Sequence, residues 1–478
     1  MGTEIKKGDL IKFEKGGAVR DGKESIPYSD VWWYNKFLHY KNLFDGTAKL
    51  VQLINTKSTH PYLNSEAVQI LTLPQTISEK IADLLVGEFP EIEIQEKPET
   101  TEIFEDIAKR TRFESRVLEG VTKCSAYGHL FYRAWLDDSK SYFKFIPTEQ
   151  VLFEENDQDE IIELAILAPF FISQNNQGYI VEHHFIGRIE YYILYTSPQD
   201  DNRIKAIGSI KDYDPEREDE EITNLDYIPI VSIKNLGVGG EKYGRSDYYG
   251  KDQLFAEIEN TLSMISYVLG ENTDPWVMLP TGVIGNMGNF KRSNGKWIEK
   301  NGSEESVDII SWDASLSSAF EQLKELFDKL LFSARLSPAL FGRDTGGNLE
   351  SGRALKWRSV DTFSMLNRKR RYLDPGIKAL IKMLMELEGN KFDDKTVIDI
   401  SWQDGIPNDT EAKAEYYVQL FNAGLCSKRT AIKNIFDLQD DKSIDIEMQK
   451  IETDQKSKAD IRSQSAVSAI ISAKTGGE

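Results

Sequence analysis

Glycines and polar residues crowd one short stretch, residues 341–358, FGRDTGGNLESGRALKWR, and this composition suggests phosphate chemistry. In a Walker loop, GxxxxGK[ST], backbone amides wrap the phosphates, the Lys neutralises them and the hydroxyl binds magnesium. Gly342 and Gly347 have the required spacing, but Asn348 and Leu349 stand where the Lys and the Ser or Thr must be. The stretch therefore does not predict a nucleotide site.

A second glycine cluster raises the same question for a dinucleotide cofactor. Gly237, Gly239 and Gly240 follow the strand-like segment IPIVSIKN. A Rossmann fingerprint needs a third glycine for close packing of strand and helix, and that position falls on Lys242. We expect no cofactor.

Candidate metal and catalytic residues are equally incomplete. Residues 90–97, PEIEIQEK, are similar to the strand of a metal-dependent nuclease, but Gln95 stands at a ligand position, so we expect surface charge. His183 and His184 are adjacent in an apparent strand and must point to opposite faces. The other histidines have no spaced partner: His39, His60 and His129. We expect neither a metal site nor catalytic residues.

One basic tract remains. Seven basic residues stand against the single acid Asp361 between residues 351 and 371: Arg353, Lys356, Arg358, Arg368, Lys369, Arg370 and Arg371. They have two explanations, contact with DNA phosphates or ion pairs with acidic faces of neighbouring subunits, and we favour the second for most of them. A DNA-processing enzyme that binds substrate through residues 353–371 stays open as an alternative, as does a monomeric scaffold.

Bulk composition limits the function further. With 478 residues the chain exceeds a single compact core, so two or more structural regions are expected. The formal net charge of -20 excludes general binding of nucleic acid over the surface. Only two cysteines are present, and there is neither a signal-peptide pattern nor an apolar run of roughly 18 residues, so we expect assembly in a reducing cytoplasm and no membrane contact.

The elements that must position these residues follow from periodicity. Residues 29–113 are mostly helical in pattern, and 129–235 alternate like an antiparallel β region interrupted by an acidic solvated loop, 212–221. Apolar stripes predict one helix through residues 254–269, ending before Asp274-Pro275, and a second through 316–334, with about 40 residues of strand and turn between them. We expect an α+β fold.

The C-terminal third is predicted to be mainly helical. A long helix bent at Pro375 should run from about Ser351 to Leu387, followed by a short strand, TVIDISW. Further helices should begin near Asp409, Ser427 and Ser443, and the last residues are poor in large apolar groups.

The order of these parts resembles the portal proteins of tailed bacteriophages, in particular those from phages of Gram-positive bacteria. Three blocks carry the resemblance: GRSDYYGKDQLFAEIENTLSMISYVLGENTDPW (244–276), SPALFGRDTGGNLESGRALKWRSVDTFSMLNRKRR (337–371) and IPNDTEAKAEYYVQLFNAGLCSKRTAI (406–432). The likeness covers roughly residues 30–450.

The resemblance implies a ring of about twelve subunits at one capsid vertex, with each subunit divided into wing, stem, clip and crown. The implied boundaries are a wing at 1–249, stem helices at 250–272 and 315–336, a clip at 273–314, a tunnel loop region at 337–352, a long wing helix at 353–390, a wing strand with its connection at 391–408, a crown at 409–454 and a flexible tail at 455–478. The implied partners are double-stranded DNA in the channel, the terminase large subunit, head-to-tail adaptors, and the major capsid and scaffolding proteins.

The resemblance also assigns residues. The loop facing the DNA would comprise Arg343, Asp344, Thr345, Gly346, Gly347, Asn348 and Glu350. The stem interface between subunits would comprise Leu254, Ile258, Leu262, Ile265, Leu269, Phe320, Leu323, Phe327 and Leu330. The clip would contact the packaging motor and the adaptors through Trp276, Lys291, Arg292 and Trp297.

Overall fold

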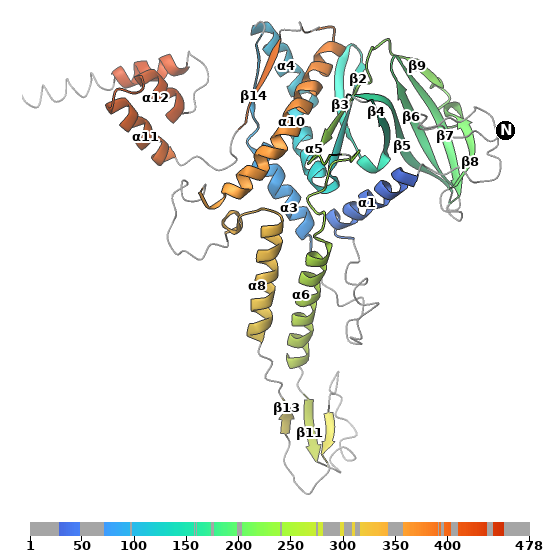
Figure 1. Cartoon of the computed structure of the whole chain (residues 1–478), viewed down its shortest axis with the longest axis vertical. Coiled ribbons are helices and arrows are strands. Elements are labelled where there is room, and N and C mark those ends of the chain that lie inside the picture. Colours follow the sequence, from blue (N-terminus) through green and yellow to red (C-terminus); the bar gives the residue numbers. More distant parts are fainter. Residues whose placement is uncertain are drawn as a thin grey trace, which may run out of the picture. The chain divides into compact units, whose positions relative to one another are not determined.

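The computed structural model describes residues 28–47, 71–95, 98–156, 158, 160–173, 176–197, 203–239, 241–273, 276–280, 297–300, 308–310, 316–342, 357–390, 392, 396–402, 410–436 and 443–453 (Figure 1). The chain divides into two compact units. One comprises Met1–Arg343 and Val360–Gly405, and the other comprises Asp344–Ser359 and Ile406–Glu478. No described helix has both the length and the apolar character needed to cross a bilayer.

Helices dominate the N-terminal part of the first unit, as the periodicity predicts. They are α1 (Tyr28–Phe44), α3 (Leu73–Ala82), which continues as a π-helical turn (Asp83–Gly87), α4 (Pro98–Thr111) and α5 (Phe113–Tyr127). The segment 90–97, considered above as a nuclease motif, forms strand β1 (Glu91–Gln95), whose Glu91 and Glu93 are exposed while Ile94 is buried. The expectation of surface charge is confirmed.

The predicted antiparallel β region is also confirmed. Its strands are β2 (His129–Asp137), β3 (Lys140–Ile146), β4 (Val151–Glu155), β5 (Ile161–Ser173), β6 (Asn176–Phe185), β7 (Arg188–Ser197), β8 (Arg203–Ser209), β9 (Glu220–Ile222) and β10 (Ile230–Lys234). Strands β4 to β8 form one sheet in chain order, and β9 pairs with β7. The acidic loop 212–221 is largely exposed, although its last residues form β9.

A smaller sheet with the order β10-β2-β3 lies in the main core of the first unit. On one face, Tyr132 of β2 donates to backbone carbonyls of α5, and Ile233 of β10 lies against the long helix α10 (Val360–Leu387). On the other face, His129 and Phe131 stack on each other and contact Phe153 of β4. Burial lowers the pKa of His129 to about 3, so its ring packs in the core as a neutral group at neutral pH.

Strand pairs connect distant parts of the chain. The predicted strand TVIDISW is β14 (Val397–Ser401), and it pairs antiparallel with β1.

His183 and His184 point to opposite faces of β6, as expected, and both are buried: His183 lies 2.8 Å from Glu163, and His184 lies 3.1 Å from Glu182.

The long helix is confirmed as α10, which begins at Val360. Residues 357 and 358 are also helical, with a turn at 359, and the predicted start near Ser351 falls in 351–356, outside the described residues. Pro375 lies inside α10 on an exposed position; it has no amide hydrogen to donate to the Arg371 carbonyl one turn earlier, and its ring lies on the solvent side.

In the second unit the helix starts are confirmed. Helix α11 (Thr410–Asn422) packs against α12 (Lys428–Ile435), and 443–453 are helical. The Ser427 hydroxyl accepts a hydrogen bond from the Thr430 amide and so caps α12.

The loop between β10 and α6 (Asp252–Thr273) crosses the end of α5 at close range. Gly128 ends α5 with φ 89°, and its carbonyl accepts from the Asn235 amide at 2.9 Å. A Cβ on Gly244 would stand 2.3 Å from the Gly128 carbonyl oxygen. Both positions therefore require glycine, one for its φ and the other for the approach of two backbones.

Replacing Gly244 with Ala should lower the free energy of unfolding by about 2–3 kcal/mol, because the contact is with backbone that cannot rotate away. Gly239→Ala is a matched control in the same loop, since nothing lies within 4 Å of its added Cβ. Chemical denaturation at one protein concentration measures both variants, and equal stability of the two would contradict the close crossing.

Candidate functional site

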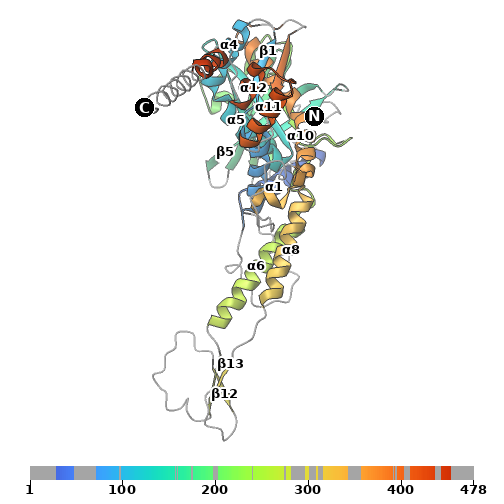
Figure 2. The same ribbon diagram turned by 90° about the vertical axis from the view of Figure 1, so that its left-hand side faces the viewer.

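Two helices of the first unit lie side by side in both views, α6 and α8 (Leu316–Ser333) (Figures 1 and 2). The predicted end of α6 before Asp274 and the predicted extent of α8 are confirmed. Their apolar stripes meet each other: Ile258, Ile265 and Leu330 are at most 5% exposed within the single chain. These three side chains pack inside the subunit and are not presented to a neighbour.

The rest of the predicted interface is more open. Leu254, Leu262, Leu323 and Phe327 are partly buried against the same core, whereas Leu269 and Phe320 are 46% and 52% exposed. Of the predicted interface residues, Leu269 and Phe320 are therefore the most accessible to a neighbouring subunit. The interface between subunits stays a prediction.

A small sheet lies between these helices in the chain. Its strands are β11 (Trp276–Pro280), β12 (Trp297–Lys300) and β13 (Asp308–Ile310), in the order β12-β11-β13. Trp276 pairs with Ile310, and Trp297 pairs with Val277. Lys291 and Arg292 lie outside the described residues.

An apolar groove of about 530 Å³ opens along α8 where it passes the start of α3. It is lined by Leu73, Thr76, Ile77, Phe320, Leu323, Lys324, Phe327, Leu330, Leu331 and Phe341. Lys324 is the only charged residue among them, so the groove suits an apolar side chain with an acidic group at its rim.

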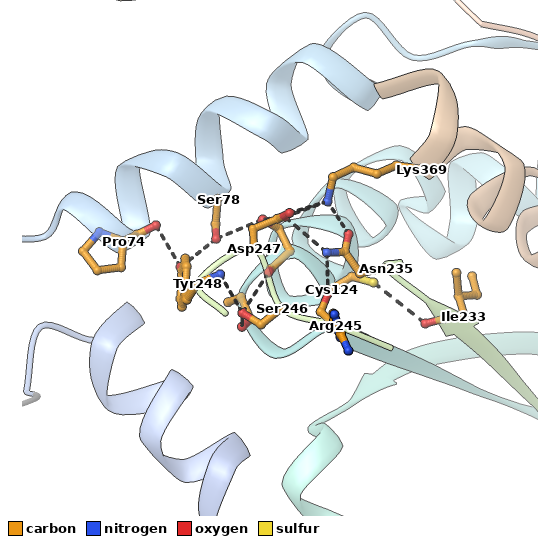
Figure 3. Close-up of polar contacts among 12 residues, drawn as sticks. Pro74, Ser78, Cys124, Ile233, Asn235, Arg245, Ser246, Asp247, Tyr248 and Lys369 are labelled. Carbon is orange, nitrogen blue, oxygen red and sulfur yellow. Dashed lines mark hydrogen bonds and ion pairs between the residues drawn. The ribbon is translucent and has the colours of Figure 1, made fainter. Parts of the chain in front are cut away.

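A buried ion pair fixes α10 to the loop that leads into α6 (Figure 3). Lys369 Nζ lies 2.8 and 2.6 Å from the two carboxylate oxygens of Asp247, and it donates to Asn235 Oδ1 at 2.6 Å. Lys369 is 2% exposed and Asp247 is 7% exposed. A charge this deeply buried is tolerated only when its hydrogen bonds are satisfied, as they are here.

The network extends from this pair to two further helices (Figure 3). The Ser125 hydroxyl of α5 donates to Asp247 Oδ2 at 2.6 Å and lies 3.1 Å from Ser78 Oγ of α3. Ser78 Oγ is 2.6 Å from the Tyr248 hydroxyl, which donates to the Pro74 carbonyl. The start of α6 is thereby held to α3, α5 and α10.

Cys124 borders the same network without any sign of reactivity. Its Sγ lies 3.8 Å from the Ile233 carbonyl, and burial raises the pKa of the thiol to about 12. The group stays protonated at neutral pH, where a nucleophile or a metal ligand would need to be a thiolate.

The expected role of the basic tract is therefore corrected for Lys369, which binds Asp247 of its own chain and can reach neither DNA nor a neighbour. Arg370 lies over the ring of Trp402. Arg358, Arg368 and Arg371 are exposed. Arg353 and Lys356 lie outside the described residues.

Two of the exposed arginines share an open cleft. Val360, Phe363, Ser364, Asn367, Arg368 and Arg371 of α10 line a hollow of about 420 Å³. Its polar groups fit an anion, either a phosphate or a carboxylate.

The predicted loop facing the DNA lies outside the described residues throughout: Arg343, Asp344, Thr345, Gly346, Gly347, Asn348 and Glu350. Sequence reasoning missed Asp247 and Asn235, because a buried partner for Lys369 has no local sequence signal. It also missed Phe332, an apolar residue on the polar side of α8 that is 83% exposed. In the described part of the chain, no three His, Cys, Asp or Glu residues are grouped as metal ligands.

Comparison with known proteins gives one family. Residues 35–460 match the family described as phage portal protein, SPP1 Gp6-like. Among curated proteins no match was found.

Solved structures resemble the chain only distantly. One is a chain of the virion of a native gene transfer agent particle, with 12% identity, a TM-score of 0.44, and coverage of 88% of this chain and 95% of that one. Another is in the neck of the native particle computed with C12 symmetry, with 11% identity, a TM-score of 0.42, and coverage of 86% and 93%. A third is in the neck of the empty particle computed with C6 symmetry, with 12% identity, a TM-score of 0.45, and coverage of 81% of this chain and 93% of that one. TM-scores this low carry no weight by themselves.

Replacing Lys369 with Met should lower the free energy of unfolding by about 3–5 kcal/mol, because Asp247 would stay buried without its cation. Thermal or chemical unfolding at one protein concentration measures the effect.

The matched control is Lys382→Met on the same helix, whose ion pair with Glu386 is 3.7 Å long with the lysine 55% exposed. This change should cost about 1 kcal/mol or less. Adding Asp247→Asn should restore part of the stability lost by the Lys369 variant. An equal small cost for the two lysine variants would contradict the role given to the buried pair.

Proposed function

The chain belongs to the SPP1 Gp6-like family of phage portal proteins, and we propose that it forms a ring of about twelve copies at one capsid vertex. Double-stranded DNA would pass through this ring during packaging and ejection. The observation that carries the proposal is the family match over residues 35–460, which takes in all but the ends of the chain.

The helices and strands can be assigned to the four regions of a portal subunit. In this proposal α6 and α8 form the stem, and the small sheet of β11, β12 and β13 belongs to the clip. The wing comprises the helices up to α5, strands β1 to β10, α10 and β14. The crown comprises α11, α12 and 443–453. The buried Lys369–Asp247 pair would then join the wing helix α10 to the base of the stem.

Electrostatics suit a channel through which DNA slides. Each Lys or Arg held against a phosphate adds sequence-independent affinity that must be broken at every step. The net charge of -20 and the internal use of Lys369 both reduce such contacts. A duplex would meet a surface that repels it weakly and keeps it mobile.

The loop 343–350 would provide the local contact with DNA. Its Gly346 and Gly347 accept backbone conformations that other residues avoid, and its Thr345 and Asn348 can touch phosphates without a permanent charge. We propose that this loop adjusts as the duplex advances through a ring of different symmetry.

The partners follow from these placements. The clip, including Trp276, Lys291, Arg292 and Trp297, would contact the terminase large subunit during packaging and the head-to-tail adaptors afterwards. The wing would contact the major capsid and scaffolding proteins, with assembly in the host cytoplasm and final location in the virion.

Purified protein should sediment as a discrete species of about twelve chains, because heterologous interfaces close when the rotation between neighbours divides a full turn. Sedimentation velocity over a range of protein concentrations measures the mass. A chain that stays monomeric at every concentration would remove the proposal.

Replacing both Gly346 and Gly347 with Pro should reduce DNA packaging by at least about tenfold while rings still assemble, because Pro fixes φ where the loop must adjust. An in vitro packaging assay with purified motor and procapsids gives the measurement, and sedimentation gives the control. Normal packaging by this variant would exclude the loop from the mechanism.

A further inference from the structure

Helix α8 presents two different surfaces that its own chain leaves uncovered among the described residues. One is the apolar groove shared with α3, which Phe327 and Leu331 help to line. The other is Phe332, whose side chain is 83% exposed. Among the large apolar side chains of the described residues Phe332 is the most exposed, so burying it against a second copy would stabilise the contact more than any other of them could.

The two surfaces point in different directions. Five residues separate Phe327 from Phe332, and at about 100° per residue their side chains project about 140° apart around α8. In a ring of about twelve copies, the two neighbours of any copy lie about 150° apart as seen from it. A groove on one side and a protruding ring on the other are the halves of a heterologous contact.

The groove and Phe332 also lie at nearly the same height along α8. Leu330 and Leu331 line the groove two residues and one residue before Phe332, and each residue corresponds to a displacement of about 1.5 Å along the helix. Rotation about an axis parallel to α8 keeps each residue at the same height along that axis. Phe332 of one copy therefore reaches the Leu331 end of the groove in the next copy.

The charges near Phe332 and near the groove are of opposite sign. Glu321 and Asp328 are exposed on the side of α8 that carries Phe332, eleven and four residues before it. Lys324 lines the groove about 80° from Phe332 around α8, four residues before Asp328, and is exposed as well. Contact between copies would place the acids of one beside the lysine of the next, which favours one orientation of docking.

We propose that Phe332 of each copy inserts into the groove between α3 and α8 of the next copy, at the end formed by Leu331, Ile77 and Phe341. This inference rests on the proposed ring, in which α8 lies along the channel axis. It identifies the partner of the groove as a second copy of this chain and distinguishes the two contacting surfaces.

Cysteine crosslinking tests this pairing directly. Thr76 is exposed at the groove and Phe332 is exposed on the opposite surface, so Thr76→Cys and Phe332→Cys are placed together in one chain that also carries Cys426→Ser. Cys124 is buried and can remain. A short bismaleimide should give a ladder of covalent oligomers under denaturing conditions. Each single variant should give monomer bands only, because a heterologous contact never brings a residue to its own copy.

Three results would overturn the inference. One is a monomer band from the double variant although the uncrosslinked protein sediments as a ring; this leaves the proposed function intact. The second is dimers from Phe332→Cys alone, which indicates a two-fold contact. The third is absence of a ring from the unmodified chain, which removes the proposed function together with this inference.

A charge at position 332 gives an independent measurement. Phe332→Asp should lower the fraction of chains in rings at least tenfold at a protein concentration where the unmodified chain is half assembled. Ser333→Asp adds the same charge at the neighbouring exposed position and should change that fraction less than twofold. Mass photometry counts both species, and equal assembly of the two variants would overturn the proposal.

Discussion

The arrangement of the first unit depends on one buried ion pair, Lys369 with Asp247. The pair joins the middle of α10 to the loop that starts α6, and Asn235, Ser125 and Ser78 extend the connection to β10, α5 and α3. The hydrophobic effect that drives apolar packing is not directional. Hydrogen bonds to a buried charge have defined geometry, so they specify how the α6–α8 pair leaves the body of the subunit.

Much of this fold follows from local patterns. The stripe of Leu254, Ile258 and Leu262 correctly predicts α6, and Asp274-Pro275 correctly predicts its end. Alternating aromatic and β-branched residues predict the antiparallel β region over 129–235, in which the structure has strands β2 to β10. The composition of residues 351–358 does not reveal the turn at 359, which separates the helical residues 357 and 358 from α10.

The functional surfaces were less predictable, since they depend on which faces meet in space. Periodicity shows that Ile258 belongs to an apolar stripe on α6 and Leu330 to one on α8, but it cannot show that both are buried within one chain. Likewise, the basic tract signals positive charge, whereas the distant Asp247 decides that Lys369 is used internally. Among the described residues, the surfaces open to another molecule include the groove on α8, Phe332 beside an acidic face, and the exposed arginines of α10.

The central claim is that identical chains close around a channel through different surfaces of the α6–α8 pair. Cryo-electron microscopy of the purified full chain tests it most directly. The account predicts closed rings in which α8 helices surround a central hole wide enough for a DNA duplex. Images of a solitary molecule, or of rings with the α6–α8 pairs apart and pointing outward, would contradict it.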